Sequence, residues 1–232
     1  MANQATSDRR IRLLEAAAGL LVQWGFDKTS VDDIAREAGV SKGAVYLEFP
    51  SKEAIFQGVL YREFGRYVED WLRRFEADEE DWDFARMVQH SILAIHANPV
   101  VKALMTRDKR MYGNLLRQDT RLMAISSSAH AELFLHLQRL GALRSDLSPK
   151  VLAYLIGAMS YGLIAGDEAI PEENRVDFDA AVDGFGQLLN RALSPETMKN
   201  RAEARQAIIE VTRKLRDELL ASLSAPGKGT GL

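Results

Sequence analysis

Apolar residues recur along this chain at the three- and four-residue spacing of amphipathic helices, and no stretch shows the two-residue alternation of a strand. In the first helix the apolar positions are Ile11, Leu14, Ala17, Ala18, Leu21 and Val22, and Gly25 ends the helix. Further helices are expected at 52–75, 84–97, 100–106, 109–139, 148–165, 177–193 and 196–223. The pattern predicts an all-α protein.

Between the first of these helices and the helix that begins after Ser51, the sequence predicts two short ones. A hydroxyl at 29–30 precedes the first short helix and can cap its start. Gly39 ends this helix, because glycine readily adopts a positive φ. Ser41 caps the second, and Pro50 stops it. Two short helices joined by a glycine-containing turn, with a third helix before them, are typical of a helix-turn-helix.

The chain divides by composition and pattern into five segments. We expect a flexible N-terminus at 1–7, a helix-turn-helix domain at 8–56 with its core at about 30–49, a larger helical domain at 57–193, an additional helix at 194–223 and a flexible tail at 224–232. The acidic stretch 76–83 reads as a solvated turn. We interpret the larger domain as the regulatory and dimerisation part.

Composition narrows the class of protein. Of 232 residues, 47% are hydrophobic and 27% charged, which suits a globular chain with a large core. The absence of cysteine excludes disulfides and thiolate metal sites. The apolar run 151–165 is shorter than the ~20 residues that span a bilayer, and the start lacks the apolar core of a signal peptide. We therefore expect a cytoplasmic protein without a membrane partner.

Candidate catalytic and metal sites are weak. The histidines at 90, 96, 130 and 136 form two pairs spaced six apart, which does not place two imidazoles on one helix face. No set of nucleophile, base and orienting group and no phosphate-binding loop is visible. We expect no enzyme, no metal and no cofactor.

The second short helix carries an outward face suited to DNA. Lys42 can reach a phosphate or a guanine edge, Gly43 and Ala44 allow close approach to bases, and Tyr46 offers a hydroxyl to phosphate. Thr29, Ser41 and Lys52 are further candidates for contact with DNA, because they lie at helix N-termini, where backbone amides favour anions. Each residue alone has an ordinary structural explanation, but their arrangement indicates nucleic-acid binding.

The stretch "TSVDDIAREAGVSKGAVYLEFPSKE", residues 29–53, resembles the DNA-binding domain of the tetracycline-repressor (TetR/AcrR) family. About the first quarter of the chain, residues 8–56, carries the resemblance. It implies an all-α homodimer that enters successive major grooves of a palindromic operator and is usually released by a small ligand. By position, the implied DNA contacts are Thr29, Ser41, Lys42, Gly43, Ala44, Tyr46 and Lys52.

Leu47 and Glu48 depart from the family pattern, which favours aromatic residues or histidine after the tyrosine. A local role for Glu48 is to stabilise Lys52, four residues on, and the start of the next helix. The alternative is that Glu48 accepts a hydrogen bond from a cytosine amine. Residues 1–60 hold seven Lys and Arg against eight Asp and Glu, so binding would depend on a few placed cations.

The helices at 148–165 and 177–193 are the candidates for a dimer interface. Small residues in the first permit close helix packing, and the second has a strongly apolar face. An ordinary core within one chain is the alternative. The residues expected at the interface are Ala153, Gly157, Tyr161, Phe178, Val182, Phe185 and Leu189.

Methionine and aromatic residues between the middle helices suit an adaptable apolar cavity, although many of them would be plain core. The candidate ligand-binding residues are Phe64, Trp71, Met87, His90, Ser91, Met105, Tyr112, Met123 and Ser126. The additional helix at 194–223 has its own apolar stripe. It could pack on the regulatory domain, extend the dimer interface or lie on a surface; we favour packing within the dimer.

The sequence thus predicts a ligand-responsive transcriptional repressor that leaves a palindromic operator when it binds a small, largely apolar molecule. The alternative is a DNA-binding regulator controlled by a protein partner, or an activator without a small-molecule inducer. The expected partners are double-stranded DNA, a second copy of the chain and a small-molecule effector.

Overall fold

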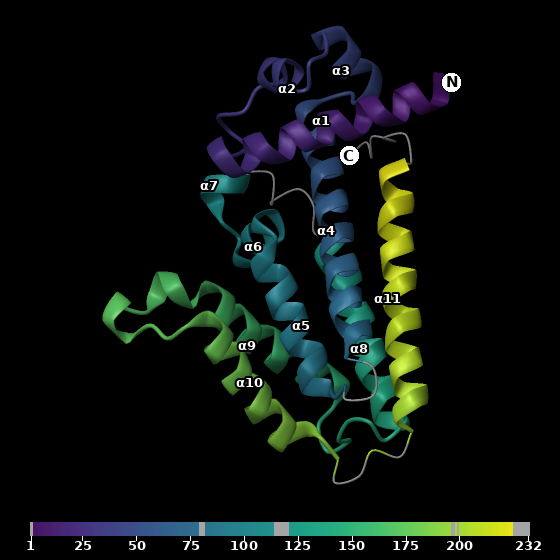
Figure 1. The fold of residues 1–232 in the computed structure, drawn as a ribbon, viewed down its shortest axis with the longest axis vertical. Helices are drawn as coiled ribbons and strands as arrows, with labels where there is room; N and C mark the ends of the chain where they lie inside the picture. The colour runs from purple at the N-terminus through teal and green to yellow at the C-terminus, as the bar shows by residue number, and fades with distance from the viewer. Residues whose placement is uncertain (1, 79–81, 114–120, 196–197, 199, 225–232) are drawn as a thin grey trace. The chain divides into compact units, whose positions relative to one another are not determined.

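The computed structural model describes residues 2–78, 82–113, 121–195, 198 and 200–224. All regular structure in these ranges is helical, which confirms the all-α prediction (Figure 1). The helices are α1 (Ala2–Trp24), α2 (Val31–Glu37), α3 (Lys42–Glu48), α4 (Lys52–Ala77), α5 (Phe84–Ala97), α6 (Pro99–Thr106), α7 (Lys109–Tyr112), α8 (Arg121–Arg139), α9 (Pro149–Ala169), η2 (Glu172–Asn174), α10 (Phe178–Leu193) and α11 (Arg201–Ser224).

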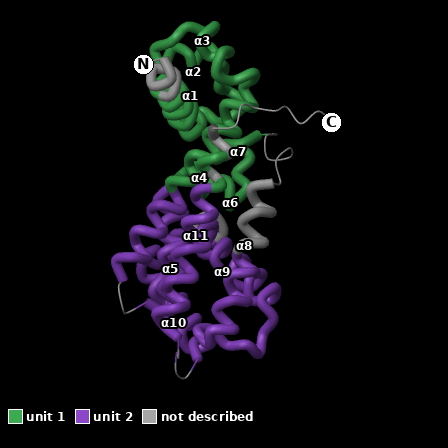
Figure 2. The backbone as a smooth tube through the Cα atoms, turned by 90° about the vertical axis from the view of Figure 1, so that its right-hand side faces the viewer, with its two compact units in different colours: residues 1–66, 99–120, 218–232 green, residues 67–98, 121–217 purple. Residues whose placement is uncertain are grey.

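Two compact units interleave along the chain (Figure 2). Unit 1 comprises residues 1–66, 99–120 and 218–232, and unit 2 comprises residues 67–98 and 121–217.

In unit 1, α2 and α3 lie together on one side of α1 (Figure 1). Their common core contains Leu14, Ile34 and Val45, which are 3% exposed or less. Gly58 lets α4 approach α1 closely, because a Cβ at this position would come within 2.8 Å of a Leu14 methyl group. The buried apolar residues and the close contact at Gly58 hold together the three-helix arrangement that the sequence predicts.

The segment 99–113 also belongs to unit 1, and it docks on the turn after α1. The backbone N–H of Phe26 donates to the carbonyl of Met111 at 2.7 Å. Gly25 has φ +79°, and the Arg110 carbonyl occupies the space that a Cβ would need. A side chain at position 25 would therefore be both strained and blocked.

In unit 2, α10 packs along α5. Val182, Phe185 and Leu189 turn inward from α10 and are at most 8% exposed. Phe178 stacks on His96 with ring centroids 3.8 Å apart. The Gln89 amide donates to the Val182 carbonyl at 3.3 Å, close to Gly186. This pairing places the apolar face of α10 inside the chain.

Residues 201–217 of α11 belong to unit 2 and pack there on the end of α4. Ala204 and Ile208 are fully buried, and the Arg205 guanidinium donates to the Glu76 carbonyl at 2.9 Å. Arg213 pairs with the Glu76 carboxylate at 2.7 Å, and Arg201 donates to the Trp82 carbonyl at 3.0 Å. Among the fates considered for this helix, these contacts support packing against unit 2 of the same chain.

Three local predictions are corrected. The helix expected over 109–139 is interrupted, because α7 ends at Tyr112 and Gly113 takes φ +51° against the Asp27 carboxylate. Helix α1 begins at Ala2, where a flexible segment was expected. Ile11 and Val22 are 48% and 45% exposed, whereas Leu13 and Leu20 fill the inner face instead.

Other expected elements agree more closely. The helix expected at 84–97 is α5 with the same bounds, and α6, α9 and α10 begin within one residue of their expected positions. The helix expected at 196–223 begins at Arg201. The tail 225–232 lies outside the described residues.

Candidate nucleic-acid interface

Hydrogen bonds at the helix starts hold α2 and α3 in place. Ser30 accepts from the backbone of Asp33 at 3.1 Å, and Asp33 accepts from the backbone of Ser30 at 3.0 Å, a reciprocal capping box. The bond from the Ser30 side chain keeps the pKa of Asp33 below its usual value. Ser41 accepts from the Ala44 backbone at 3.2 Å and so caps α3. Gly39, with φ +65°, makes the turn between the two helices.

The outward side of α3 carries the residues expected to meet DNA. Ser41, Lys42, Gly43 and Tyr46 are exposed, while Ala44 is half-buried. A Cβ added at Gly43 would meet nothing nearer than the Ser41 hydroxyl at 4.0 Å. The side from Ser41 to Tyr46 is therefore open to a partner, and Val45 is turned into the core.

Lys42 is held by an acid of the neighbouring helix. Its ammonium lies 2.9 Å from the Asp32 carboxylate, and this bond raises the pKa of Lys42. Both side chains are more than half exposed. The cation at the start of α3 thus has a local counter-charge, which DNA phosphates would have to replace.

Glu48 turns away from the open side of α3. Arg9 of α1 donates to its carboxylate through Nε at 2.8 Å and through a second guanidinium nitrogen, and the Glu48 side chain is 6% exposed. Arg10 donates to the Glu48 carbonyl at 3.0 Å and lies over the Phe49 ring. The C-terminal end of α3 is therefore attached to α1.

These contacts revise two expectations. Glu48 pairs with Arg9, whereas Lys52 lies over the Phe26 ring with its ammonium 4.1 Å from the centroid. Thr29 is 1% exposed and its hydroxyl donates to the Gly25 carbonyl at 2.8 Å, so its side chain cannot contact DNA in this conformation. No local sequence signal joins Arg9 to Glu48, 39 positions away.

The residues expected at the dimer interface fall into two groups, one buried within the chain and one exposed. Val182, Phe185 and Leu189 are buried against α5 and belong to the core within one chain. Phe178 is half-buried and stacks on His96 of the same chain. The helix α9 instead leaves an apolar face uncovered. Gly157 is exposed, Ala153 is half-buried and Tyr161 is 47% exposed. The other large apolar side chains on this face or nearby on α10 are Val151, Tyr154, Leu155, Met159 and Leu188, each at least 41% exposed.

The α9 helix is also long and apolar enough over Pro149–Gly166 to cross a membrane by length and composition, and only 17% of that window is buried. A single such helix is weak evidence for a membrane span, because helices of soluble proteins pass the same test.

Several expected ligand-binding residues have partners inside their own unit. In unit 1, Phe64 is buried, and the buried Tyr112 hydroxyl donates to the Val100 carbonyl at 2.5 Å. Burial raises the pKa of Tyr112 well above its usual value. Met105, also in unit 1, is half-buried.

In unit 2, the Trp71 indole donates to the carbonyl of Met87 at 3.0 Å. Ser91 pairs with the Tyr67 hydroxyl at 2.8 Å, and His90 with Asp78 at 2.6 Å. These contacts give most of the expected ligand residues a structural role. The side chains of Met123 and Ser126 lie outside the description.

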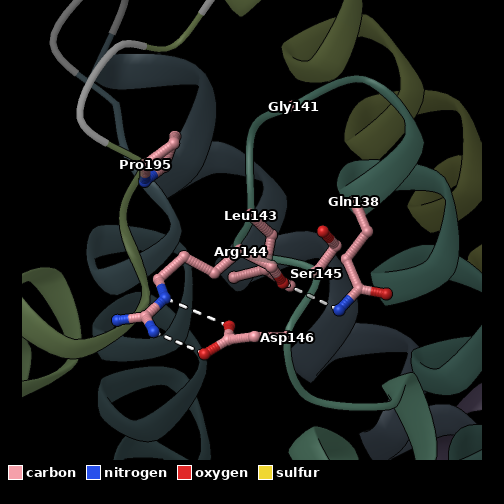
Figure 3. Close-up of a pocket in the computed structure, with 7 residues that line it drawn as sticks. All are labelled: Gln138, Gly141, Leu143, Arg144, Ser145, Asp146 and Pro195. Carbon is pink, nitrogen blue, oxygen red and sulfur yellow. Dashed lines mark hydrogen bonds and ion pairs between the residues drawn. The ribbon is translucent and has the colours of Figure 1, made fainter.

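An open hollow of about 490 Å³ lies beside the loop that follows α8 (Figure 3). Its polar groups are already engaged with one another. Arg144 pairs with Asp146, and the Gln138 amide donates to the Arg144 and Leu147 carbonyls at 2.8 and 2.7 Å. These bonds stabilise the loop, and none of the expected ligand residues lines this hollow.

Comparison with known proteins agrees with this geometry. The model of the family "Bacterial regulatory proteins, tetR family" matches residues 13–59, which cover α2, α3 and parts of α1 and α4. The nucleoid occlusion factor SlmA of Vibrio campbellii is 31% identical over 121 residues, 49% of this chain and 59% of that protein. The regulator RutR of Escherichia coli is 36% identical over 80 residues, 34% of this chain and 36% of its own.

The similarity spans less than two thirds of the first curated relatives: 59% of the Vibrio protein, and 16% and 40% of two HTH-type regulators of Bacillus subtilis. Solved structures extend the likeness of fold. FadR of Bacillus subtilis in complex with stearoyl-CoA has a TM-score of 0.60 at 17% identity, covering 77% of this chain and 96% of that one. NalD of Pseudomonas aeruginosa has a TM-score of 0.60 at 20% identity, covering 83% and 100%.

An all-α chain with α2 and α3 presented on α1 defines a helix-turn-helix protein. The family match covers this motif, and the solved structures share the fold of the chain. Over residues 13–59 the chain is therefore similar to the bacterial regulatory proteins of the tetR family.

Proposed function

We propose that this protein is a transcriptional regulator that binds a palindromic DNA operator as a homodimer. The observation that carries the proposal is the open side of α3, where Ser41, Lys42, Gly43 and Tyr46 are exposed on a short helix fixed at both ends. A helix presented in this way fits the major groove, whose width admits one α-helix.

The proposed contact set is Ser41, Lys42, Gly43, Ala44, Tyr46 and Lys52. Lys42 and Tyr46 supply hydrogen bonds to phosphate or base edges, and Gly43 with Ala44 keeps the helix close to the bases. Thr29 is left out because its side chain is buried. Its bond to the Gly25 carbonyl gives it the role of stabilising the turn before α2.

DNA binding is tested by a gel shift with the DNA upstream of the protein's own coding region, using the unaltered chain, Lys42→Ala and Tyr46→Ala. Each substitution is expected to weaken binding by about tenfold or more, because each removes a contact from both half-sites. Lys150→Ala, a cation removed from the exposed start of α9, is the matched control and is expected to bind normally. Normal binding by both α3 variants would refute the assignment of α3.

The second copy is proposed to cover the exposed face of α9. Tyr154 is 75% exposed there, and Val151, Leu155 and Met159 of the same helix are each at least 41% exposed, which is unusual for large apolar side chains on one helix. The exposed Gly157 and Gly162 would let two helix backbones approach closely. Two copies also place two α3 helices on one DNA molecule, which a single helix-turn-helix needs for useful affinity.

We further propose that a small, largely apolar effector releases the protein from its operator, so that it acts as a repressor. The support is the likeness in fold to FadR bound to stearoyl-CoA, and the 39% identity over 61 residues to the A-factor receptor protein of Streptomyces griseus. Within unit 1, the α6–α7 segment docks on the turn before α2, so a change in this segment would reach the DNA-binding helices directly.

The effector is sought by screening acyl-CoA thioesters, free fatty acids and lactones for thermal stabilisation of the protein and for release of bound operator. A compound that does both supports the repressor. The alternative is regulation by a protein partner, or activation without an inducer. It predicts that no compound releases the protein from its operator. It also predicts that a reporter gene falls silent when the regulator is deleted.

A further inference from the structure

The end of α3 exposes one large apolar side chain. Leu47 is 79% exposed, more than any other large hydrophobic residue in the described part of the chain. It directly follows Tyr46, which is 50% exposed and belongs to the proposed DNA contact set. A single exposed leucine on a surface needs no explanation, but this one lies on the helix whose outward side otherwise supplies polar contacts and close approach.

The surface of α3 one turn before Leu47 is open. Gly43, one helical turn earlier on the same side, has no side chain, and a Cβ there would meet nothing closer than 4.0 Å. Glu48, the next residue, is withdrawn to Arg9 and its side chain is 6% exposed. The leucine side chain therefore projects from α3 beside Gly43, where no side chain covers the helix.

Of the groups in the major groove, the C5-methyl of thymine is the one that an aliphatic side chain can recognise. The other distinguishing groups are hydrogen-bond donors and acceptors, and leucine satisfies none of them. Phosphate contact is unsuitable for the same reason. An apolar side chain in contact with the thymine methyl removes both from water, and the gain is specific to thymine among the four bases.

We propose that Leu47 is a specificity-determining residue that selects thymine at one position of each operator half-site through contact with its methyl group. This inference rests on the proposed function, since it needs α3 in the major groove. It assigns to Leu47 a role different from the hydrogen bonds proposed for Lys42 and Tyr46, because its effect depends on the presence of a methyl group alone.

The test begins with selection of bound sequences from a randomised duplex library by the unaltered full-length protein. Each thymine of the selected operator is then replaced in turn by deoxyuridine, which removes only the methyl group and leaves base pairing intact. Replacement at one position per half-site is expected to weaken binding about three- to fivefold for each half-site. Other thymines serve as internal controls.

Leu47→Ala is expected to bind the thymine operator about as weakly as the unaltered protein binds the deoxyuridine operator, and to show no difference between the two. The matched control is Val22→Ala, since Val22 is an exposed aliphatic residue of α1 at 45% exposure. It is expected to keep the full thymine preference. Because Leu47 is exposed, its removal should leave the melting temperature unchanged, so that weak binding is not a folding defect.

The outcomes distinguish a failure of the role proposed for Leu47 from a failure of the DNA-binding function itself. Enrichment of an operator whose thymine methyls make no Leu47-dependent difference would overturn the role of Leu47 and leave the DNA-binding function standing. Failure of the unaltered protein to enrich any sequence would overturn both. A change of oligomeric mass in Leu47→Ala without DNA would instead assign the leucine to a contact between copies, and would also overturn its role as a thymine reader.

Discussion

The Nε of Arg9 lies 2.8 Å from the Glu48 carboxylate, and this pair joins the first turns of α1 to the last turn of α3. An acid at the end of a DNA-reading helix would repel phosphates if it faced them. Here it faces a guanidinium of its own chain, and Arg10 holds the adjacent carbonyl at 3.0 Å. The pair therefore fixes the recognition helix and removes its negative charge from the outward side.

Arg9→Ala is predicted to destabilise the protein and weaken operator binding, because it leaves the Glu48 carboxylate without its partner where that side chain is only 6% exposed. A lost hydrogen bond between charged groups costs about 1.5–3 kcal/mol. The measurement is denaturant unfolding of Arg9→Ala, Glu48→Gln and the double variant, with operator affinity determined for each.

The double variant distinguishes positioning from phosphate contact. If Arg9 acts through Glu48, adding Glu48→Gln to Arg9→Ala should recover part of the lost stability and affinity. If Arg9 instead binds phosphate, the losses in affinity from the two substitutions should simply add, and the role described here would be wrong.

A second prediction concerns Asp32, which holds Lys42 at 2.9 Å in the absence of DNA. Asp32→Asn removes the competing carboxylate, so DNA affinity should rise several-fold at low salt, for random as well as operator sequences. Lys42→Ala should lower affinity and make the log–log salt slope shallower by about 1 for each protomer. Fluorescence anisotropy over a range of salt concentrations measures both effects.

The log–log slope of operator affinity against salt concentration, measured for the unaltered protein, tests the broader expectation that few cations reach DNA. Several of the basic residues in 1–60 are engaged within the protein, among them Arg9 with Glu48 and Arg36 with Asp33. We therefore expect a slope no steeper than about −8 for the dimer. A steeper value would show that many more phosphate contacts form than the structure suggests.

A third prediction concerns α11, whose Ile208 is fully buried in unit 2. Ile208→Ala should lower the free energy of unfolding by about 2–5 kcal/mol, because it removes buried methyl groups and leaves a cavity. Ile11→Ala, at a 48% exposed position, is the matched control. Deletion of 195–232 should lower the melting temperature as well, and an unchanged melting temperature and dimer mass would show that the helix is dispensable.

The helix-turn-helix was predictable from sequence because its determinants are local. The Ser30 and Ser41 caps and the Gly39 turn each depend on residues within four positions, and the structure contains all three. The break after Tyr112 was missed although Gly113, like Gly25 and Gly39, is a glycine that readily takes a positive φ. The apolar period continues past Gly113, and the sequence does not show that this glycine lies against the Asp27 carboxylate.

The same reasoning explains the errors at the site. Helical periodicity correctly identifies Val182, Phe185 and Leu189 as a buried face, but it does not say whether a helix of the same chain or of another copy covers it. Thr29 fits the pattern of a helix start, yet its hydroxyl bonds back to Gly25 and the side chain is buried. Tertiary contacts decide both cases.

The last prediction concerns the exposed face of α9. Tyr154→Glu introduces a charge where the side chain is 75% exposed in one copy but would be buried between two. An unpaired charge at a buried interface is costly, so the variant should be a monomer by light scattering and retain its helical circular dichroism. Its operator affinity should fall at least tenfold, because one helix-turn-helix reads only one half-site.

Val176→Glu is the matched control for Tyr154→Glu, since Val176 is 70% exposed on the loop between η2 and α10. We expect this variant to remain a dimer with normal DNA binding. If Tyr154→Glu also stays dimeric, the second copy does not cover this part of α9. Binding of the unaltered protein to lipid vesicles, abolished by Tyr154→Glu, would instead assign the exposed face to a membrane surface.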